Sequence, residues 1–230
     1  MIQEIIHSKI FLLALTVGVY YGSLQLYKRW KFALFNPLLV SIVVIIGVLM
    51  LLDIDYTEYY QANDIINFML GLSVVALAYL LEQNYQKIKD NALTISISLF
   101  SGSIVAILTT WLVAYLMGAD KVIIASILPK STTTAIAIAI SHNSGGVAAI
   151  TSIAVIFAGL FGSVLGPWLL KVVRVKDSVA RGLALGAASH AMGTAKAMEM
   201  GAVEGAVGGA AIGLMGAITA IIIPVMEKIF

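Results

Sequence analysis

LPKSTTTAIAIAISHNSGG, residues 128–146, places a lysine and four consecutive hydroxyl residues inside a sequence that is otherwise typical of a membrane protein. A second polar interruption, LGAASHAMGTAKAMEMG, follows at residues 185–201. An ionisable residue at bilayer depth is costly, and by default it marks a binding site or a transport pathway. We therefore interpret these two segments as the functional part of the chain and the remaining apolar sequence as their scaffold.

Apolar residues dominate the chain: 60% of the 230 residues are hydrophobic, 11% are charged, and the mean hydropathy is +1.00. Runs of about 18 or more apolar residues predict transmembrane helices. Such runs cover residues 9–27, 35–52, 64–81, 92–117, 147–173 and 203–230. No stretch between them is long enough for a separate soluble core. The sequence therefore predicts an all-α polytopic membrane protein, one integral membrane domain over residues 1–230, with about six to eight transmembrane segments.

Several chemistries are excluded by what the sequence lacks. There is no cysteine, so thiolate catalysis, disulfides and cysteine-based metal sites cannot occur. The three histidines show no metal-ligand spacing and no GxSxG motif is present, so we expect no metal, no cofactor and no enzymatic activity. The net charge of +2 is small and most basic residues flank apolar runs, which argues against nucleic acid as a partner.

The positions of Lys and Arg predict which segments cross the membrane, because cytoplasmic edges carry more of them. If every apolar segment crossed, the edge cations would divide 5 inside and 7 outside. If residues 127–141 enter from outside and return, and residues 183–200 enter from inside and return, 9 lie inside and 3 outside. The inside set is Lys28, Arg29, Lys31, Lys87, Lys89, Lys171, Arg174, Lys176 and Arg181, and the outside set is Lys9, Lys121 and Lys228.

If residues 64–81 re-enter in place of residues 127–141, 8 edge cations lie inside and 4 lie outside. The charge count therefore separates the two re-entrant arrangements only weakly. In either arrangement the two polar segments are not ordinary lipid-facing helices. We predict that they are discontinuous or re-entrant, that they meet near the midplane, and that the N-terminus lies outside the cell.

Anion binding is the chemistry that the first polar segment favours. Pro129 tends to start a helix, which would put Lys130, Ser131 and Thr132 in a first turn whose free N–H groups attract an anion. Lys130 adds a full charge, and the hydroxyls of Ser131, Thr132, Thr133 and Thr134 both donate and accept. We expect a small carboxylate with a hydroxyl or keto group. The alternative is that Lys130 snorkels to the interface and the threonines bond their own helix.

The second polar segment predicts one small, polar helix face. Two sets of residues share this face at i, i+4, i+7 spacing: Ser189, Gly193 and Lys196, and beside them His190, Thr194 and Ala197. Lys196 is a second candidate for anion binding, and its alternative is an ion pair with Glu199. His190 is a candidate proton relay or a hydrogen bond to a neighbouring helix. Glu199 and Glu204 either take part in proton coupling or face water.

Glycines recur every four residues near the C-terminus, at Gly201, Gly205, Gly209 and Gly213, and a similar set precedes them at Gly159, Gly162 and Gly166. Small residues at this spacing let helices approach closely. We expect these glycines to allow tight helix packing within one chain. A helix interface between two copies of the chain is the alternative. We also expect a homo-oligomer.

These residues resemble the LrgB/CidB family, to which a plant plastidal glycolate/glycerate translocator also belongs. The family pattern comprises P-K-S-x-T-T, G-P-x-L-L-K, R-G-L-A-x-G-x-x-S-H-A-x-G-T-A and E-G-A. It is matched at residues 129–134, 166–171, 181–195 and 204–206. Leu72 and Ala135 stand where proline is usual in the family.

The resemblance implies a multi-pass protein of the cell inner (plasma) membrane, encoded in many bacteria beside a small holin-like LrgA/CidA partner. It implies either a carrier of small monocarboxylates or a regulator of murein hydrolase activity and cell lysis that acts with that partner. Only a carrier needs buried anion-binding chemistry, so we expect a carrier of the glycolate, glycerate, lactate or pyruvate type. Its partners would be this substrate and membrane lipid, and the lysis regulator is the alternative.

Cysteine labelling tests the predicted topology in a chain that has no cysteine of its own. Single cysteines at Asp55, Asp120 and Asn143 are expected to react with an impermeant thiol reagent in intact cells, because all three lie in outside loops. A cysteine at Asp177 is expected to react only after permeabilisation. Labelling of Asp177→Cys in intact cells would rule out the re-entrant scheme.

Overall fold

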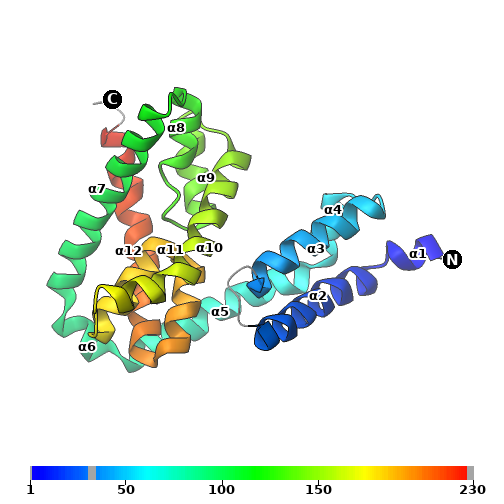
Figure 1. Cartoon of the computed structure of the whole chain (residues 1–230), viewed down its shortest axis with the longest axis horizontal. Coiled ribbons are helices and arrows are strands. Elements are labelled where there is room, and N and C mark those ends of the chain that lie inside the picture. The colour runs from blue at the N-terminus through cyan, green and yellow to red at the C-terminus, as the bar shows by residue number, and fades with distance from the viewer. Residues whose placement is uncertain (1, 31–34, 227–230) are drawn as a thin grey trace. The chain divides into compact units, whose positions relative to one another are not determined.

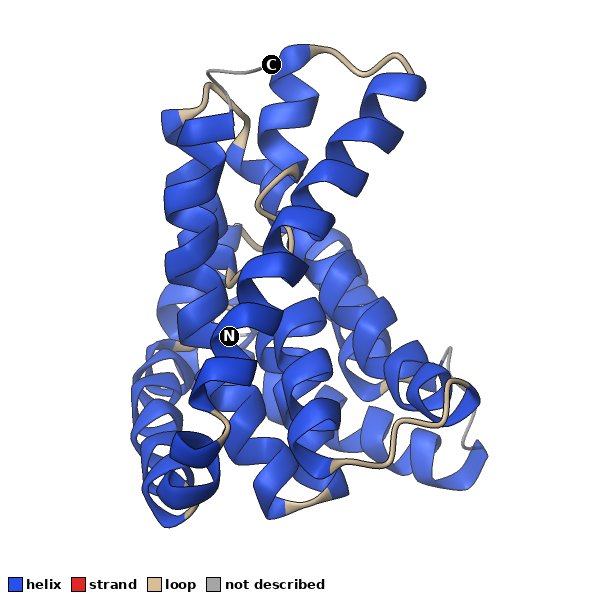
Figure 2. Cartoon of the chain, turned by 90° about the vertical axis from the view of Figure 1, so that its left-hand side faces the viewer, coloured by secondary structure: helices blue, strands red, loops and turns tan. Residues whose placement is uncertain are grey.

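The computed structural model describes residues 2–30 and 35–226, apart from six side chains in the helix α5 (Asp64–Gln83). Those six belong to Asn67, Leu70, Gly71, Ser73, Val74 and Leu77. Lys31 and Lys228 of the charge count lie outside the described residues. Every regular element in the described part is helical (Figure 2), as the sequence predicts. The chain divides into two compact units, Met1–Ala76 and Leu77–Phe230, and a single domain stays a prediction.

The first unit contains the helices α1 (Ile2–Ile6), α2 (Lys9–Trp30), α3 (Pro37–Leu51), α4 (Tyr56–Ala62) and the start of α5. Proline opens α3, where its missing N–H costs nothing, and the Asn36 side chain accepts the Leu38 N–H at 3.0 Å. The buried core joins Leu12 of α2 to Ile54 and Ala62. This unit is therefore a small helical layer with a core of its own.

The second unit continues through α6 (Tyr85–Asp90), α7 (Ala92–Leu116), α8 (Lys121–Ile127), α9 (Thr134–Asn143), α10 (Ala148–Val172), α11 (Ser178–Met200) and α12 (Ala202–Met226), as Figure 1 shows. Among the described residues, four helices are long and apolar enough to cross a membrane: α2, α7, α10 and α12. With 15 residues, α3 is shorter. The prediction of an all-α polytopic membrane protein is confirmed.

Both polar segments are broken helices. The chain leaves helical geometry between α8 and α9, at residues 128–133, and again within α11 at Ser189 and His190. His190 has φ 42° and ψ −129°, a backbone conformation that residues other than glycine rarely adopt. By contrast α5 is continuous through Leu72, the position where the family has proline. The predicted discontinuities are therefore present at the two polar segments.

The break in α11 reverses the chain. A Cβ built on Gly193 would collide with the Leu185 carbonyl oxygen, although the two residues are eight positions apart. In a straight helix eight residues span about 12 Å, so the two halves must fold back on each other. The continuous one-face helix expected for residues 189–197 is therefore wrong: α11 is a hairpin whose tip is formed by Ser189 and His190.

Both halves of this hairpin pack on the start of α12 through glycines. On the first half, Gly182 contacts the Glu204 backbone, and a Cβ on Gly186 would lie 2.7 Å from Gly208 Cα. On the second half, Thr194 faces Gly208 of α12, and a Cβ built on Gly208 would lie 3.1 Å from Thr194 Oγ1. Helix backbones approach this closely only where no Cβ intervenes. Glycines therefore hold the hairpin against α12.

The C-terminal glycine row is only partly used in this packing. Gly205 and Gly209 are buried, whereas Gly213 is exposed and a Cβ there would have nothing within 4 Å. The earlier row on α10 faces the α11 hairpin, because a Cβ on Gly162 would lie 2.8 Å from Ser189 Cβ. These contacts are within one chain, and the homo-oligomer stays a prediction.

Alanine substitution at two glycines tests this packing. Gly186→Ala is expected to lower the free energy of unfolding by about 1–3 kcal/mol, because the new Cβ meets rigid backbone of α12. Gly213→Ala is the matched control, expected to be neutral or up to about 1 kcal/mol stabilising through helix propensity. Thermal unfolding of the detergent-purified variants measures both. Equal melting temperatures would show that α11 and α12 are not in close contact.

Candidate functional site

The first break places Lys130 inside the second unit. Pro129 and Thr132 are buried, and the Thr132 hydroxyl donates to the Pro129 carbonyl at 2.9 Å. The Lys130 ammonium is partly buried and donates to Thr110 Oγ1 of α7 at 2.7 Å. Lys130 therefore contacts a neighbouring helix, α7. The Ser103 hydroxyl of α7 lies 3.2 Å from that of Thr219 on the parallel helix α12, so Thr110 is level with about residue 226, near the C-terminal end of α12. The snorkelling alternative is compatible with this position.

The helix after Pro129 begins later than the sequence predicts. Lys130, Ser131 and Thr132 lie in turns, with the Lys130 N–H bonded to the Ile127 carbonyl at 3.2 Å. Thr133 is the N-cap of α9, and its hydroxyl accepts the Ile136 N–H at 3.4 Å. The expected first helical turn at residues 130–132 is therefore wrong, because Thr133 rather than Pro129 provides the cap. Thr134 is the first residue of α9.

No carboxylate neutralises Lys130 among the described side chains. The ion pairs in the described residues join His7 to Glu58, Arg181 to Glu204 and Lys196 to Glu199. A cation taken out of water is costly unless an opposite charge or several acceptors replace its hydration. A single hydroxyl is an incomplete replacement. The geometry at Lys130 therefore suits a bound anion.

The second break carries buried hydroxyls without partners. Ser189 Oγ and Thr194 Oγ1 are both buried and have no hydrogen-bond partner in the described structure. Such groups call for an explanation, because an unpaired buried hydroxyl costs free energy. His190 is also buried, and its Nε2 donates to the Val155 carbonyl of α10 at 3.0 Å. The tip of α11 therefore offers two free hydroxyls beside a fixed imidazole.

Contacts on α10 place the two breaks at the same level. In the α9–α10 hairpin the Thr151 hydroxyl donates to Ser141 at 2.7 Å. The helices α9 and α10 are antiparallel, so moving back along α9 corresponds to moving forward along α10. Thr133 is eight residues before Ser141, and Gly159 is eight residues after Thr151. Both offsets are about 12 Å, so Thr133 is level with Gly159. A Cβ on Gly159 would lie 2.7 Å from His190 Cε1. Both breaks therefore lie near the middle of α10.

Contacts on α12 give the same result independently. Ile136 of α9 packs on Gly216, so Thr133 is level with about residue 213 of this parallel helix. Gly186 of α11 packs on Gly208, so Ser189 is level with about residue 211. Both positions are close to the middle of α12, which runs from Ala202 to Met226. The two polar segments thus approach the same depth from opposite ends of the unit.

Lys196 is not placed like Lys130. Its ammonium pairs with the Glu199 carboxylate at 2.6 Å, and their side chains are 33% and 68% exposed. This is the ion pair that the sequence left open as the alternative to anion binding. Lys196 also lies on the second half of the α11 hairpin, beyond the tip. Ser189 and His190 therefore form the tip, Thr194 faces Gly208 of α12 one helical turn beyond it, and Lys196 is held in a pair with Glu199.

Two contacts were not anticipated from the sequence. Thr110 accepts a hydrogen bond from Lys130. A polar residue within an apolar helix was the one sequence feature that could have indicated this contact. The Arg181 guanidinium pairs with Glu204 at 2.8 Å, and Glu204 is buried. Glu204 therefore ties the first half of α11 to α12, which gives it a structural role that its sequence position did not indicate.

Comparison with known proteins finds a match to the LrgB-like family over residues 16–229. The holin-like protein CidB of Staphylococcus aureus is 38% identical over 221 residues, which cover 96% of both chains. The protein of the same name from Staphylococcus epidermidis is 36% identical with the same coverage. An uncharacterized protein of Haemophilus influenzae is 36% identical over 99% of this chain and 97% of its own. No solved structure matches.

Valine substitution at Thr110 tests whether Lys130 depends on an internal acceptor. Thr110→Val keeps the side-chain shape and removes the hydroxyl, so it is expected to lower the free energy of unfolding by about 1–3 kcal/mol. Thr109→Val is the matched control, because the exposed Thr109 hydroxyl donates only within its own helix, to Val105 at 2.7 Å and Ala106 at 3.2 Å. Thermal unfolding in detergent measures both variants. Equal losses would show that the Thr110 hydroxyl does not stabilise Lys130.

Proposed function

The chain belongs to the LrgB-like family, and on that premise we propose that it is a membrane carrier for small 2-hydroxy or 2-keto monocarboxylates. Glycolate, glycerate, lactate and pyruvate are the substrates of this type. The observation that carries the proposal is the Lys130 ammonium, which is partly buried and has a hydroxyl but no carboxylate as its partner among the described residues. A substrate carboxylate would supply the missing charge.

The substrate's second oxygen would be bound from the other hairpin. Ser189 and Thr194 have free hydroxyls that can donate to a keto group or accept from a hydroxyl group. Ser131, Thr132, Thr133 and Thr134 border the opposite break, and His190 lies at the tip of α11. We propose that these residues bind one monocarboxylate between the two tips, near the midplane.

Two hairpins that enter from opposite sides suit this function. We propose that α8 and α9 form a re-entrant segment from outside and that α11 forms one from inside, with the N-terminus outside, as the charge count predicts. Broken helices at the midplane are typical of transporter substrate sites, because their free backbone groups can bind a ligand. If a proton is coupled to transport, we propose His190 as its carrier, because it lies at the break in α11 whereas Glu199 and Glu204 are held in ion pairs.

A holin-like role is the second candidate, and the names of the relatives favour it over transport. The similar proteins from the two Staphylococcus species are named holin-like protein CidB. On this basis the chain would regulate murein hydrolase activity and cell lysis, acting with a small LrgA/CidA-like membrane partner. Such a role works through protein contacts and does not require an uncompensated lysine at a buried helix break.

Uptake into proteoliposomes tests the carrier proposal. Unmutated protein is expected to take up at least one of labelled glycolate, glycerate, lactate and pyruvate. Lys130→Gln is expected to weaken the apparent affinity about 30-fold or more, because loss of a buried cation from an anion site costs about 2–5 kcal/mol. The concentration dependence of uptake at matched protein density measures the effect.

Two further lysines serve as comparisons in the same assay. Lys89→Gln removes an exposed charge outside both polar segments and is expected to transport like the unmutated protein. Lys196→Gln decides how far the site extends: a large loss would place Lys196 at the substrate, and no loss would leave it in its pair with Glu199. If Lys130→Gln matched Lys89→Gln, the site would be misplaced. If the unmutated protein carried none of the four acids, the holin-like role would take the lead.

A further inference from the structure

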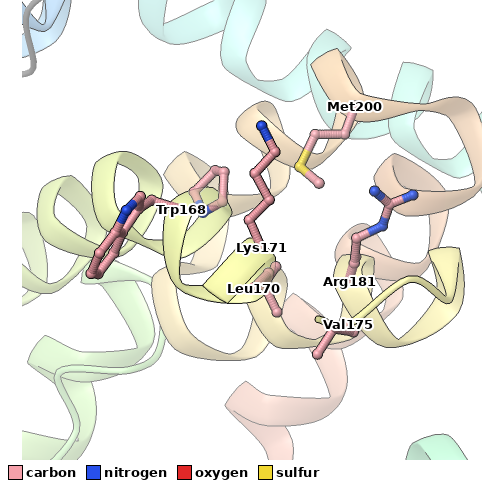
Figure 3. A pocket seen from close by; sticks show the side chains of 7 residues that line it. Trp168, Leu170, Lys171, Val175, Arg181 and Met200 are labelled. Atoms are coloured by element: carbon pink, nitrogen blue, oxygen red, sulfur yellow. The ribbon is translucent and has the colours of Figure 1, made fainter. Parts of the chain in front are cut away.

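A cavity of about 320 Å³ lies where α10 ends and the two ends of the α11 hairpin come together. It is lined by Pro167, Trp168, Leu170, Lys171, Val175, Arg181 and Met200. Figure 3 shows Lys171 on α10 and Arg181 on α11, with the Met200 side chain between them in this view. The volume is at the lower end of the roughly 300–1,000 Å³ that ligand sites occupy. The cavity is far along α10 from the two breaks and is separate from the proposed carrier site.

The lining is positively charged and otherwise almost entirely apolar. Lys171 and Arg181 are its ionisable residues, and no carboxylate lines it. Arg181 donates one Nη to Glu204 at 2.8 Å, but its Nε is buried and has no hydrogen-bond partner in the described structure. Arginine binds phosphate and carboxylate groups through adjacent N–H groups. Arg181 is already paired with Glu204, whereas Lys171 has no carboxylate partner among the described residues, so the lining keeps an unneutralised positive charge.

We propose that this cavity binds the phosphate of an acidic phospholipid headgroup. Basic pockets between membrane helices at the cytoplasmic edge are suited to such headgroups, because the phosphate meets Lys and Arg while the acyl chains remain in the bilayer. Lys171 is in the last turn of a membrane-spanning helix, among the basic residues that the charge count assigns to the cytoplasmic side. The phosphate would bind between Lys171 and Arg181.

The apolar walls favour a lipid over a soluble anion. Trp168 and Leu169 on the outer surface of the same helix turns are 63% and 52% exposed, and Val172 is 56% exposed. These exposed apolar side chains lie next to the cavity in sequence and offer an acyl chain an apolar surface near the two cations. A small hydroxy acid has no apolar part to place there. The inference does not depend on the proposed transport activity.

Quenching of Trp168 fluorescence tests the lipid site directly. Trp30 and Trp111 would be replaced by Phe, so that emission reports on the tryptophan that lines the cavity. Phosphatidylglycerol with brominated acyl chains is expected to quench this emission at lower mole fractions than brominated phosphatidylcholine in otherwise identical vesicles. Lys171→Gln is expected to weaken the phosphatidylglycerol effect about fivefold, the effect of losing one basic contact near a headgroup.

Lys176→Gln is the matched control, because it removes the same charge from an exposed position in the loop after α10, and Lys176 does not line the cavity. It is expected to retain the preference for phosphatidylglycerol. The proposal would be overturned by equal quenching with both lipids, or by equal loss in Lys171→Gln and Lys176→Gln. Displacement of the lipid by soluble glycerol phosphate or lactate would instead assign the cavity to a soluble anion. Transport measured on the same samples keeps the two proposals separate.

Discussion

A helix break frees backbone groups that need partners wherever water is absent, and the second unit contains two such breaks among its long apolar helices. Each break is packed against these neighbouring helices. At the second break the solution is glycine: Gly159 and Gly162 of α10 make room for His190 and Ser189, and Gly186 lies against the backbone of Gly208. The breaks can exist because these neighbours have no side chains in the way.

Polar groups at both breaks have partners on neighbouring helices. The partly buried Lys130 ammonium has the Thr110 hydroxyl of α7 as its acceptor. The tip of α11 is held by the His190 bond to Val155, which leaves the neighbouring hydroxyls of Ser189 and Thr194 free. Its base is fixed by the Arg181 pair with Glu204. The bonded side chains therefore hold the α11 hairpin in place while these two hydroxyls have no partner among the described residues. Such an arrangement suits a polar ligand.

The sequence predicted the features that depend on composition and local chemistry. Apolar run lengths indicated the long helices, and the clustered hydroxyls with Lys130 and Ser189 indicated where the helices would break. The sequence did not predict the features that depend on contacts between residues far apart in the chain. The start of α9 depends on which of several hydroxyl residues turns back to cap the helix, and Thr133 does so. The reversal at His190 depends on glycines of α10 and α12, which no local pattern within residues 185–201 could reveal.

The α8–α9 hairpin has a consequence for how this protein is made. Its two helices contain 7 and 10 residues, whereas a membrane-spanning helix needs about 20. The helices that cover it include α10, through Thr151 and Ser141, and α12, through Gly216 and Ile136. Both follow it in the chain, so the ribosome completes the hairpin before these supports exist. A chain that stops before α12 would therefore lack the Gly216 contact that covers one side of this hairpin.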